Sequence, residues 1–266
     1  MKKKVQYQNK NIVYKINGSG PALILLHGFL ESKAIWDDFT ETLQKDFTTI
    51  AIDLPGHGES ELIAKTHTMQ HLAGAVKEVM LAENIELAVI TGHSMGGYAA
   101  LQLAVDNEKF VKGLVLFHSN ANADTEETRV NRQRTINIVK QNRGGFISQF
   151  IPDLFDPKHV AKYSSDIQKL QNQASMMSSE SIIAALSGMR DRPDHLQFLL
   201  LTDIPVLFIV GKQDSRMPYN QLMAQAVIPS QSEVLLLEDV GHMGFIEAPE
   251  KTLDALKHFA LRCFAL

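Results

Sequence analysis

The stretch AVITGHSMGGYAALQLA, residues Ala88–Ala104, places three glycines and one serine between two apolar segments. The first segment is β-branched, as in a buried strand, and the second is rich in alanine and leucine, as in a helix. Ser94 lies at the junction, two residues after Gly92 and two before Gly96. In so tight a turn a side chain at either glycine would collide with the adjoining strand or helix. The stretch therefore predicts a strand–turn–helix junction that raises the Ser94 hydroxyl above the edge of a sheet.

Apolar runs rich in valine, isoleucine and leucine recur on both sides of this junction, and each is too short for a helix. They do not alternate with polar residues, so we expect central strands buried on both faces. The six runs are Pro21–Gly28, Thr48–Gly56, Leu87–Ser94, Lys112–Ser119, Ile204–Asp214 and Ser232–His242.

Helical patterns separate these runs. From Met69 to Met80 apolar side chains recur at intervals of three and four residues, and Thr68 is a suitable N-cap. This alternation predicts an α/β fold: a mostly parallel sheet with helices on both faces. Two runs near the start, Val5–Tyr7 and Ile12–Ile16, predict an antiparallel edge hairpin, which brings the expected sheet to eight strands.

The alternation stops between residues 120 and 199, where several helical patterns but no strand pattern occur. Helix breakers lie at Gly144-Gly145 and at Pro152, Pro157 and Pro193. The segment is too long for one crossover helix. We therefore expect a helical lid of residues 120–199, inserted into a core of residues 1–119 and 200–266, rather than helices that simply pack on the sheet.

A serine hydroxyl is a poor nucleophile at neutral pH and needs a base, which in turn needs an orienting acid. Asp214 follows one predicted strand and His242 follows the next. Because parallel strands end at one edge of a sheet, we expect both side chains near Ser94, in the chain order serine, acid, histidine. Asp124 is an alternative acid, although capping of a polar helix also explains it.

Backbone amides at two turns could stabilise an oxyanion. Met95 begins the predicted helix after Ser94, and Phe29 follows the strand that ends in His27. We expect these two amides to form an oxyanion hole, and His27 itself to bond to nearby backbone.

Other polar residues have structural explanations. Asp53 and His57 are expected to shape a turn, and His93, next to the serine, is expected to pack. His118 ends a strand that enters the insertion, and Phe146 and Phe150 lie within it, so these three are candidates for substrate contact. The phenylalanines could equally attach the lid to the core. Three arginines either recognise an anionic group or form a solvated helix face, which the nearby acidic residues favour: Arg129, Arg132 and Arg134.

Composition excludes several classes of function. The formal net charge is −4 and the pI is about 6.2, so we expect no nucleic-acid partner. No apolar run reaches the ~20 residues needed to span a membrane, and we expect a cytoplasmic protein with a single buried thiol, Cys263. The histidines form no metal-binding motif and no GxGxxG fingerprint is present, so neither a metal nor another cofactor is expected.

Five motifs together resemble the α/β-hydrolase fold superfamily, in particular its small, lidded, esterase-like enzymes, and the similarity covers nearly the whole chain. The motifs are HGF at His27–Phe29, DLPGHGES at Asp53–Ser60, GHSMGG at Gly92–Gly97, VGKQD at Val210–Asp214 and GHMGFIEAPE at Gly241–Glu250.

The resemblance implies roles for individual residues. Ser94 is the implied nucleophile, Asp214 the acid and His242 the base, with the amides of Phe29 and Met95 as the oxyanion hole. One departure is Leu30, where many members of the superfamily carry proline, and it puts the path of that loop in question.

These observations predict a serine hydrolase that cleaves a small-molecule carboxylic ester, lactone or thioester through an acyl-enzyme on Ser94. Two alternatives remain open. The same triad could serve a C–C bond lyase or hydrolase, or a perhydrolase, and the fold could also be a ligand-binding protein without turnover. The sequence identifies neither the substrate nor the oligomeric state.

Overall fold

The computed structural model describes residues 1–265 and contains one eight-stranded sheet in the order β1-β2-β4-β3-β5-β6-β7-β8. Strands β3 to β8 run parallel, and β2 pairs antiparallel with both β1 and β4. The predicted edge hairpin is confirmed. The strands are β1 (Lys2–Tyr7), β2 (Lys10–Asn17), β3 (Ala22–Leu26), β4 (Thr48–Ile52), β5 (Ala88–His93), β6 (Val111–Phe117), β7 (Val206–Gly211) and β8 (Ser232–Leu237).

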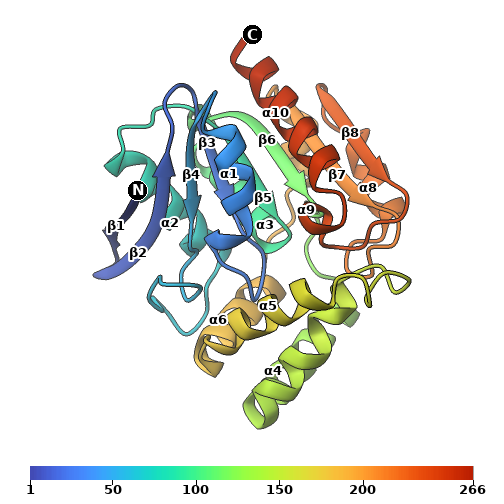
Figure 1. Cartoon of the computed structure of the whole chain (residues 1–266). Helices are drawn as coiled ribbons and strands as arrows, with labels where there is room; N and C mark the ends of the chain where they lie inside the picture. The colour runs from blue at the N-terminus through green and yellow to red at the C-terminus, as the bar shows by residue number, and fades with distance from the viewer. Residues whose placement is uncertain (266) are drawn as a thin grey trace.

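Helices cover both faces of the sheet, as predicted; α1 and α10 lie in front of it in Figure 1, and α2 and α3 lie behind it. The helices outside the β6–β7 connection are α1 (Asp37–Leu43), α2 (Met69–Ala82), α3 (Met95–Asp106), α8 (Tyr219–Ala226), α9 (Gly244–Glu247) and α10 (Pro249–Ala265). The N-cap predicted for α2 is present, because the Thr68 side chain accepts a hydrogen bond from the His71 amide.

Strand β8 corrects one prediction. Its apolar run was expected to lie in the centre of the sheet, but β8 is the outermost strand, and its first four side chains are alternately exposed and partly buried. Val234 is 40% exposed. By contrast, every side chain of β3 and β5 is buried. A continuous apolar run therefore identified a strand here but not its place in the sheet.

The chain between β6 and β7 is helical and contains α4 (Glu126–Phe150), α5 (Ser164–Ser175), α6 (Ser179–Arg190) and α7 (Leu196–Leu201). Figure 1 shows α4, α5 and α6 grouped beyond one end of the sheet. Helix α4 is kinked at Asn142, whose backbone is not helical (φ −150°, ψ 74°). The Asn142 side chain accepts a hydrogen bond from the Gly145 amide at 2.9 Å. The break predicted at Gly144-Gly145 thus falls two residues earlier, where an asparagine caps the second half of the helix.

Across residues 1–265, no helix combines the length and the apolar character that crossing a membrane would require.

Candidate active site

The turn between β5 and α3 holds Ser94 in a backbone conformation that few residues other than glycine adopt (φ 50°, ψ −114°). Three hydrogen bonds fix it. The Ser94 amide donates to the Phe117 carbonyl at 2.9 Å, and the Ser94 carbonyl accepts from the Gly97 amide at 2.9 Å and the Ser119 hydroxyl at 2.8 Å. A strained residue held by its surroundings in this way is typical of functional sites.

Close backbone approach explains the glycines around Ser94. A Cβ on Gly96 would lie 2.6 Å from the carbonyl oxygens of both Leu26 and His27, and a Cβ on Gly92 would strike the carbonyl oxygen of Gly96. The turn can therefore be this sharp only with glycine on both sides of the serine, as the spacing predicted.

Asp214 follows β7 and is held by four hydrogen bonds. One carboxylate oxygen accepts from Nδ1 of His242 at 2.8 Å and from Nδ1 of His118 at 3.1 Å. The other accepts from the amides of Arg216 and Met217 at 2.8 and 2.9 Å. Burial alone would raise the pKa of Asp214, but the two imidazoles lower its pKa well below the ordinary range. The side chain is therefore a buried carboxylate at neutral pH.

His242 follows β8, and its loop is tightly held. Its amide donates to the Leu154 carbonyl at 2.6 Å. The Glu247 carboxylate accepts from the amides of Gly241 and Met243, at 3.0 and 3.2 Å, on either side of the histidine. Because His242 donates from Nδ1 to Asp214, Nε2 of the neutral ring is left as a proton acceptor.

Ser94 and His242 line the same cavity, which has a volume of about 460 Å³ and is also bordered by Phe29, Phe150 and Leu154. Within the described residues no hydrogen bond joins the Ser94 hydroxyl to His242. Such contacts are often long in enzymes without substrate and shorten when substrate binds. Of the three residues predicted to act together, Ser94 and His242 thus border one space, and Asp214 is already paired with His242.

The oxyanion-hole candidates lie at the expected turns. Phe29 borders the cavity, and Met95 is the first residue of α3, where an amide has no acceptor within the helix. The adjacent Leu30 has a φ of +65°. Proline, fixed near −65°, cannot adopt this conformation. The leucine that departs from the family pattern therefore belongs to a loop path that proline would exclude.

His118 does not occupy the place predicted for it. It is fully buried, does not line the cavity, and donates to Asp214 instead of facing a substrate. Burial lowers the pKa of His118 to about 4, so the ring is neutral. The two predicted phenylalanines differ from each other. Phe150 borders the cavity, whereas Phe146 packs against Phe29 and Phe150 behind its wall.

A buried ion pair next to His242 was not predicted. One Glu31 carboxylate oxygen accepts from Nδ1 of His93 at 2.9 Å and from the Gly28 amide at 2.5 Å. Nε2 of His93 lies 2.9 Å from the carbonyl oxygen of His242. Both ring nitrogens face oxygen acceptors, so both carry protons and His93 is an imidazolium.

The electrostatics of this pair agree with its geometry. Burial alone would lower the pKa of His93, but the Glu31 carboxylate raises that pKa above its ordinary value. Burial alone would raise the pKa of Glu31, but His93 lowers it. No motif or periodic pattern in the sequence marks Glu31, so only the tertiary contact with His93 identifies its role.

The remaining sequence candidates have structural partners. His27 is fully buried between the Gly28 carbonyl and the Leu54 amide, as expected. Asp53 forms a buried ion pair with Lys33 at 2.6 Å, which agrees with its predicted role in a turn. Asp124 is bound by two arginines and makes no contact with His242, so the structure gives it no part in orienting the base.

His118, Asp214 and His242 are also the one group of ligating side chains in residues 1–265 close enough to surround a metal ion. Two hydrogen bonds already join them, with a proton on Nδ1 of each ring. The cluster is therefore arranged as two hydrogen-bond donors around one ionised carboxylate.

Comparison with known families agrees with this geometry. Residues 21–249 match the model of the alpha/beta hydrolase fold. The chain belongs to this family. Among structures of alpha/beta hydrolases, a thermophilic esterase from Thermogutta terrifontis, solved with malate bound, superposes with a TM-score of 0.91; it is 29% identical, and the match covers 96% of this chain and 94% of that one.

Two curated relatives span almost the same length. A pimeloyl-[acyl-carrier protein] methyl ester esterase from Pseudoalteromonas atlantica is 27% identical over 259 residues, which are 92% of this chain and 96% of the relative. The 3-oxoadipate enol-lactonase 1 of Acinetobacter baylyi is 27% identical over 259 residues, 95% of this chain and 94% of the relative. Both are similar to this chain from end to end.

Proposed function

We propose that this protein is a serine hydrolase that cleaves esters or lactones of small molecules through an acyl-enzyme on Ser94. One observation carries the proposal: His242, paired with the buried Asp214 carboxylate, and the strained Ser94 border the same cavity. The names of the curated relatives, a methyl ester esterase and an enol-lactonase, support ester-like substrates. No step of the proposed reaction uses a cofactor.

In the first step the Ser94 oxygen bonds to the carbonyl carbon while Nε2 of His242 takes the hydroxyl proton. The carbonyl π electrons move to the oxygen, which becomes an oxyanion, and we assign its stabilisation to the amides of Phe29 and Met95. Asp214 remains ionised and stabilises the imidazolium that forms on His242, as its four hydrogen bonds favour.

In the second step the oxyanion electrons re-form the carbonyl, and the bond to the leaving oxygen breaks. The imidazolium of His242 gives its proton to that oxygen, so an alcohol leaves and Ser94 carries the acyl group. Water then repeats both steps, with His242 first accepting its proton and then returning a proton to Ser94. The products are an acid and an alcohol, or one hydroxy acid when the substrate is a lactone.

We further propose that residues 120–199 act as the lid of the site. Side chains of this segment border the cavity together with Ser94, among them Phe150, Leu154 and Leu186. The segment therefore forms part of the surface that a substrate would contact, and it excludes water from the reacting atoms.

The proposal is tested by Ser94→Ala. We expect hydrolysis of p-nitrophenyl acetate to fall by about 10⁴-fold or more, because the nucleophile and base act as a unit. A fluorophosphonate probe should add one adduct to the wild type, detected by intact-mass spectrometry, and none to the variant. Ser175→Ala is the matched control, since Ser175 is exposed on α5. Full activity in Ser94→Ala protein with unchanged circular dichroism would refute the proposal.

A further inference from the structure

The cavity that contains Ser94 carries an excess of positive charge, although the whole chain has a formal net charge of −4. The charged residues on its wall, apart from His242, are the carboxylates Glu31 and Asp124 and the arginines Arg132, Arg192 and Arg216. Glu31 is already neutralised by His93. One carboxylate therefore remains against three guanidinium groups.

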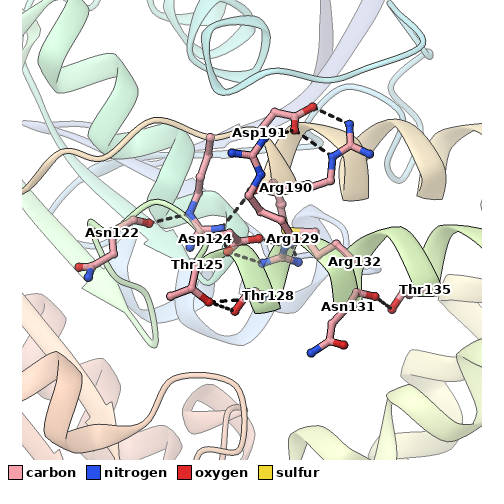
Figure 2. Close-up of polar contacts among 12 residues, drawn as sticks. Asn122, Asp124, Thr125, Thr128, Arg129, Asn131, Arg132, Thr135, Arg190 and Asp191 are labelled. Carbon is pink, nitrogen blue, oxygen red and sulfur yellow. Dashed lines mark hydrogen bonds and ion pairs between the residues drawn. The ribbon is translucent and has the colours of Figure 1, made fainter.

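That carboxylate, Asp124, lies between two of the arginines. Arg132 binds it through Nε and Nη2, and Arg192 binds it through Nη1 (Figure 2 shows Asp124 and Arg132). Arg192 is fully engaged, since it also donates to the carbonyls of Asn122 and Met189 and lies over the ring of Tyr98 at 4.1 Å.

Arg132 is less completely paired. Its Nη1 reaches only the sulfur of Met189, a weak acceptor, at 3.7 Å. Its side chain is 20% exposed, so it does not belong to the solvated face expected from the sequence. Arg129 fits that expectation, being 49% exposed and paired with Asp191 (Figure 2).

Arg216 comes from the loop that carries Asp214, and its guanidinium makes no hydrogen bond within residues 1–265. It lies over the Phe150 ring at 4.5 Å, and the Asp153 carboxylate is 3.7 Å away and largely exposed. Burial lowers the pKa of Arg216, nearby Asp153 and Asp214 oppose this, and Arg132 lowers the pKa further. Arg132 and Arg216 thus bring two positive charges to the wall of the same cavity.

We propose that Arg132 and Arg216 together bind an ionised carboxylate of the substrate. The preferred substrates are then esters that carry a second, free carboxylate, such as half-esters of dicarboxylic acids. A carboxylate offers two coplanar oxygens, which match the free fork of the Arg216 guanidinium, and Arg132 can add a hydrogen bond from Nη1 while Asp124 holds its Nε and Nη2. The protein already uses this arrangement, since Asp124 lies between Arg132 and Arg192. The inference rests on the proposed function, whose Ser94 would attack the ester end of the same molecule.

The test compares two substrates that differ in one charge, monomethyl adipate and dimethyl adipate. We expect the wild-type kcat/KM to favour the half-ester by about tenfold or more, the factor that a charge-assisted hydrogen bond typically contributes. Arg216→Gln should abolish this preference, and Arg216→Lys, which keeps the charge but loses the fork, should retain part of it. Arg132→Gln should also reduce it, provided that its melting temperature shows a folded protein.

Lys212→Gln is the matched control. It removes a positive charge from the same loop, but Lys212 pairs with Glu238 and does not line the cavity. The preference should persist in this variant. Equal kcat/KM for both esters in the wild type, or equal loss of preference in Lys212→Gln and Arg216→Gln, would overturn the inference while leaving the proposed hydrolase intact.

A binding measurement separates this inference from the proposed function. In Ser94→Ala protein, calorimetry should detect monomethyl adipate binding about tenfold or more tightly than the diester, and Arg216→Gln should remove the difference. If neither ester is hydrolysed by the wild type but this difference is present, the carboxylate site stands and the proposed reaction fails. If the difference is absent, the carboxylate site fails, whatever the activity.

Discussion

At the scale of single residues, His93 is the least expected part of the site. It immediately precedes Ser94, yet its ring packs against that of His242, between the Glu31 carboxylate and the His242 carbonyl. If His93 lost its proton, one ring nitrogen would present a lone pair to an oxygen. The ion pair therefore positions the backbone of His242 as long as His93 stays protonated.

The Glu31–His93 ion pair can be tested by Glu31→Gln. We expect the free energy of unfolding to fall by about 1–3 kcal/mol at neutral pH, because the variant loses a buried charge-assisted hydrogen bond. The raised pKa of His93 means that its contribution is complete below its unfolded pKa and is lost as pH rises through its folded pKa. The difference between wild type and variant should therefore shrink as pH rises from about 6.5, the ordinary pKa of histidine, into the alkaline range. Urea unfolding across this range measures it.

Glu238→Gln serves as the control for this series, since Glu238 is exposed and its Lys212 pair lies at the surface. It should change the free energy of unfolding by less than about 1 kcal/mol at every pH. A Glu31→Gln difference that grows with rising pH would contradict the assignment of His93 as an imidazolium.

At the scale of elements, the backbones of β3 and α3 approach each other closely beside the β5–α3 junction. Gly96, in the first turn of α3, lies against the carbonyl oxygens at the end of β3. The position of the Met95 amide, and so of the proposed oxyanion hole, depends on this approach.

We therefore predict that Gly96→Ala lowers the free energy of unfolding by about 1–3 kcal/mol, the usual cost of overpacking, and lowers kcat much more than the loss of folded protein explains. Chemical denaturation and p-nitrophenyl acetate hydrolysis measure the two effects. Gly144→Ala is the control, because a Cβ there meets nothing within 4 Å on α4. Alanine at this helical position should stabilise the protein by about 0.5–1 kcal/mol. Wild-type kcat in Gly96→Ala would disprove the argument.

Elements that depend on local pattern were predicted well from sequence. The apolar runs gave the strands, and the position of Thr68 gave the start of α2. The edge position of β8 was not predicted. It depends on which strands pair with one another, and the residues of a single apolar run do not determine that pairing. The kink in α4 lies two residues before the predicted break, because Asn142, and not the glycines after it, supplies the cap.

The same distinction applies to the site. Ser94, Asp214 and His242 each follow a strand, so the parallel topology alone predicted that they would meet. Glu31 and Arg216 stand on loops with no periodic or motif signal, and only their tertiary contacts identify them. His118 was predicted to contact substrate, but it pairs with Asp214 at a positive φ of +48°. Its position at the end of a strand does not reveal this backbone conformation.

At the scale of the whole molecule, the helical insertion is attached to the core unevenly. The His67 amide donates to the Ala184 carbonyl of α6 at 3.0 Å, and most of α6 is buried. In α4 only Ile136 and Val139 are buried before the kink at Asn142. The first half of α4, residues 126–141, thus buries fewer of its side chains than α6 does.

We predict that amides in residues 126–141 exchange with deuterium about tenfold or more faster than those of α6, because few buried contacts oppose their local opening. Mass spectrometry of peptic fragments measures this. Binding of monomethyl adipate to Ser94→Ala protein should slow exchange in 126–141, where Arg132 lies, and leave the core helix α2 unchanged. Equal protection of α4 and α6 would show that the lid is rigid.

The contacts of Leu154 and Asp156 identify a short stretch of the insertion that a redesign should keep. Leu154 accepts from the His242 amide, and the Asp156 amide donates to Glu247, the residue that clamps the same loop. Grafts from other hydrolases that aim to recruit new substrates should therefore keep this short stretch and exchange the helices on its two sides together, since Arg190 of α6 donates to Gln133 of α4. A transplant that also exchanges residues 151–156 would alter the support of the His242 loop and is expected to lower activity even where the protein folds.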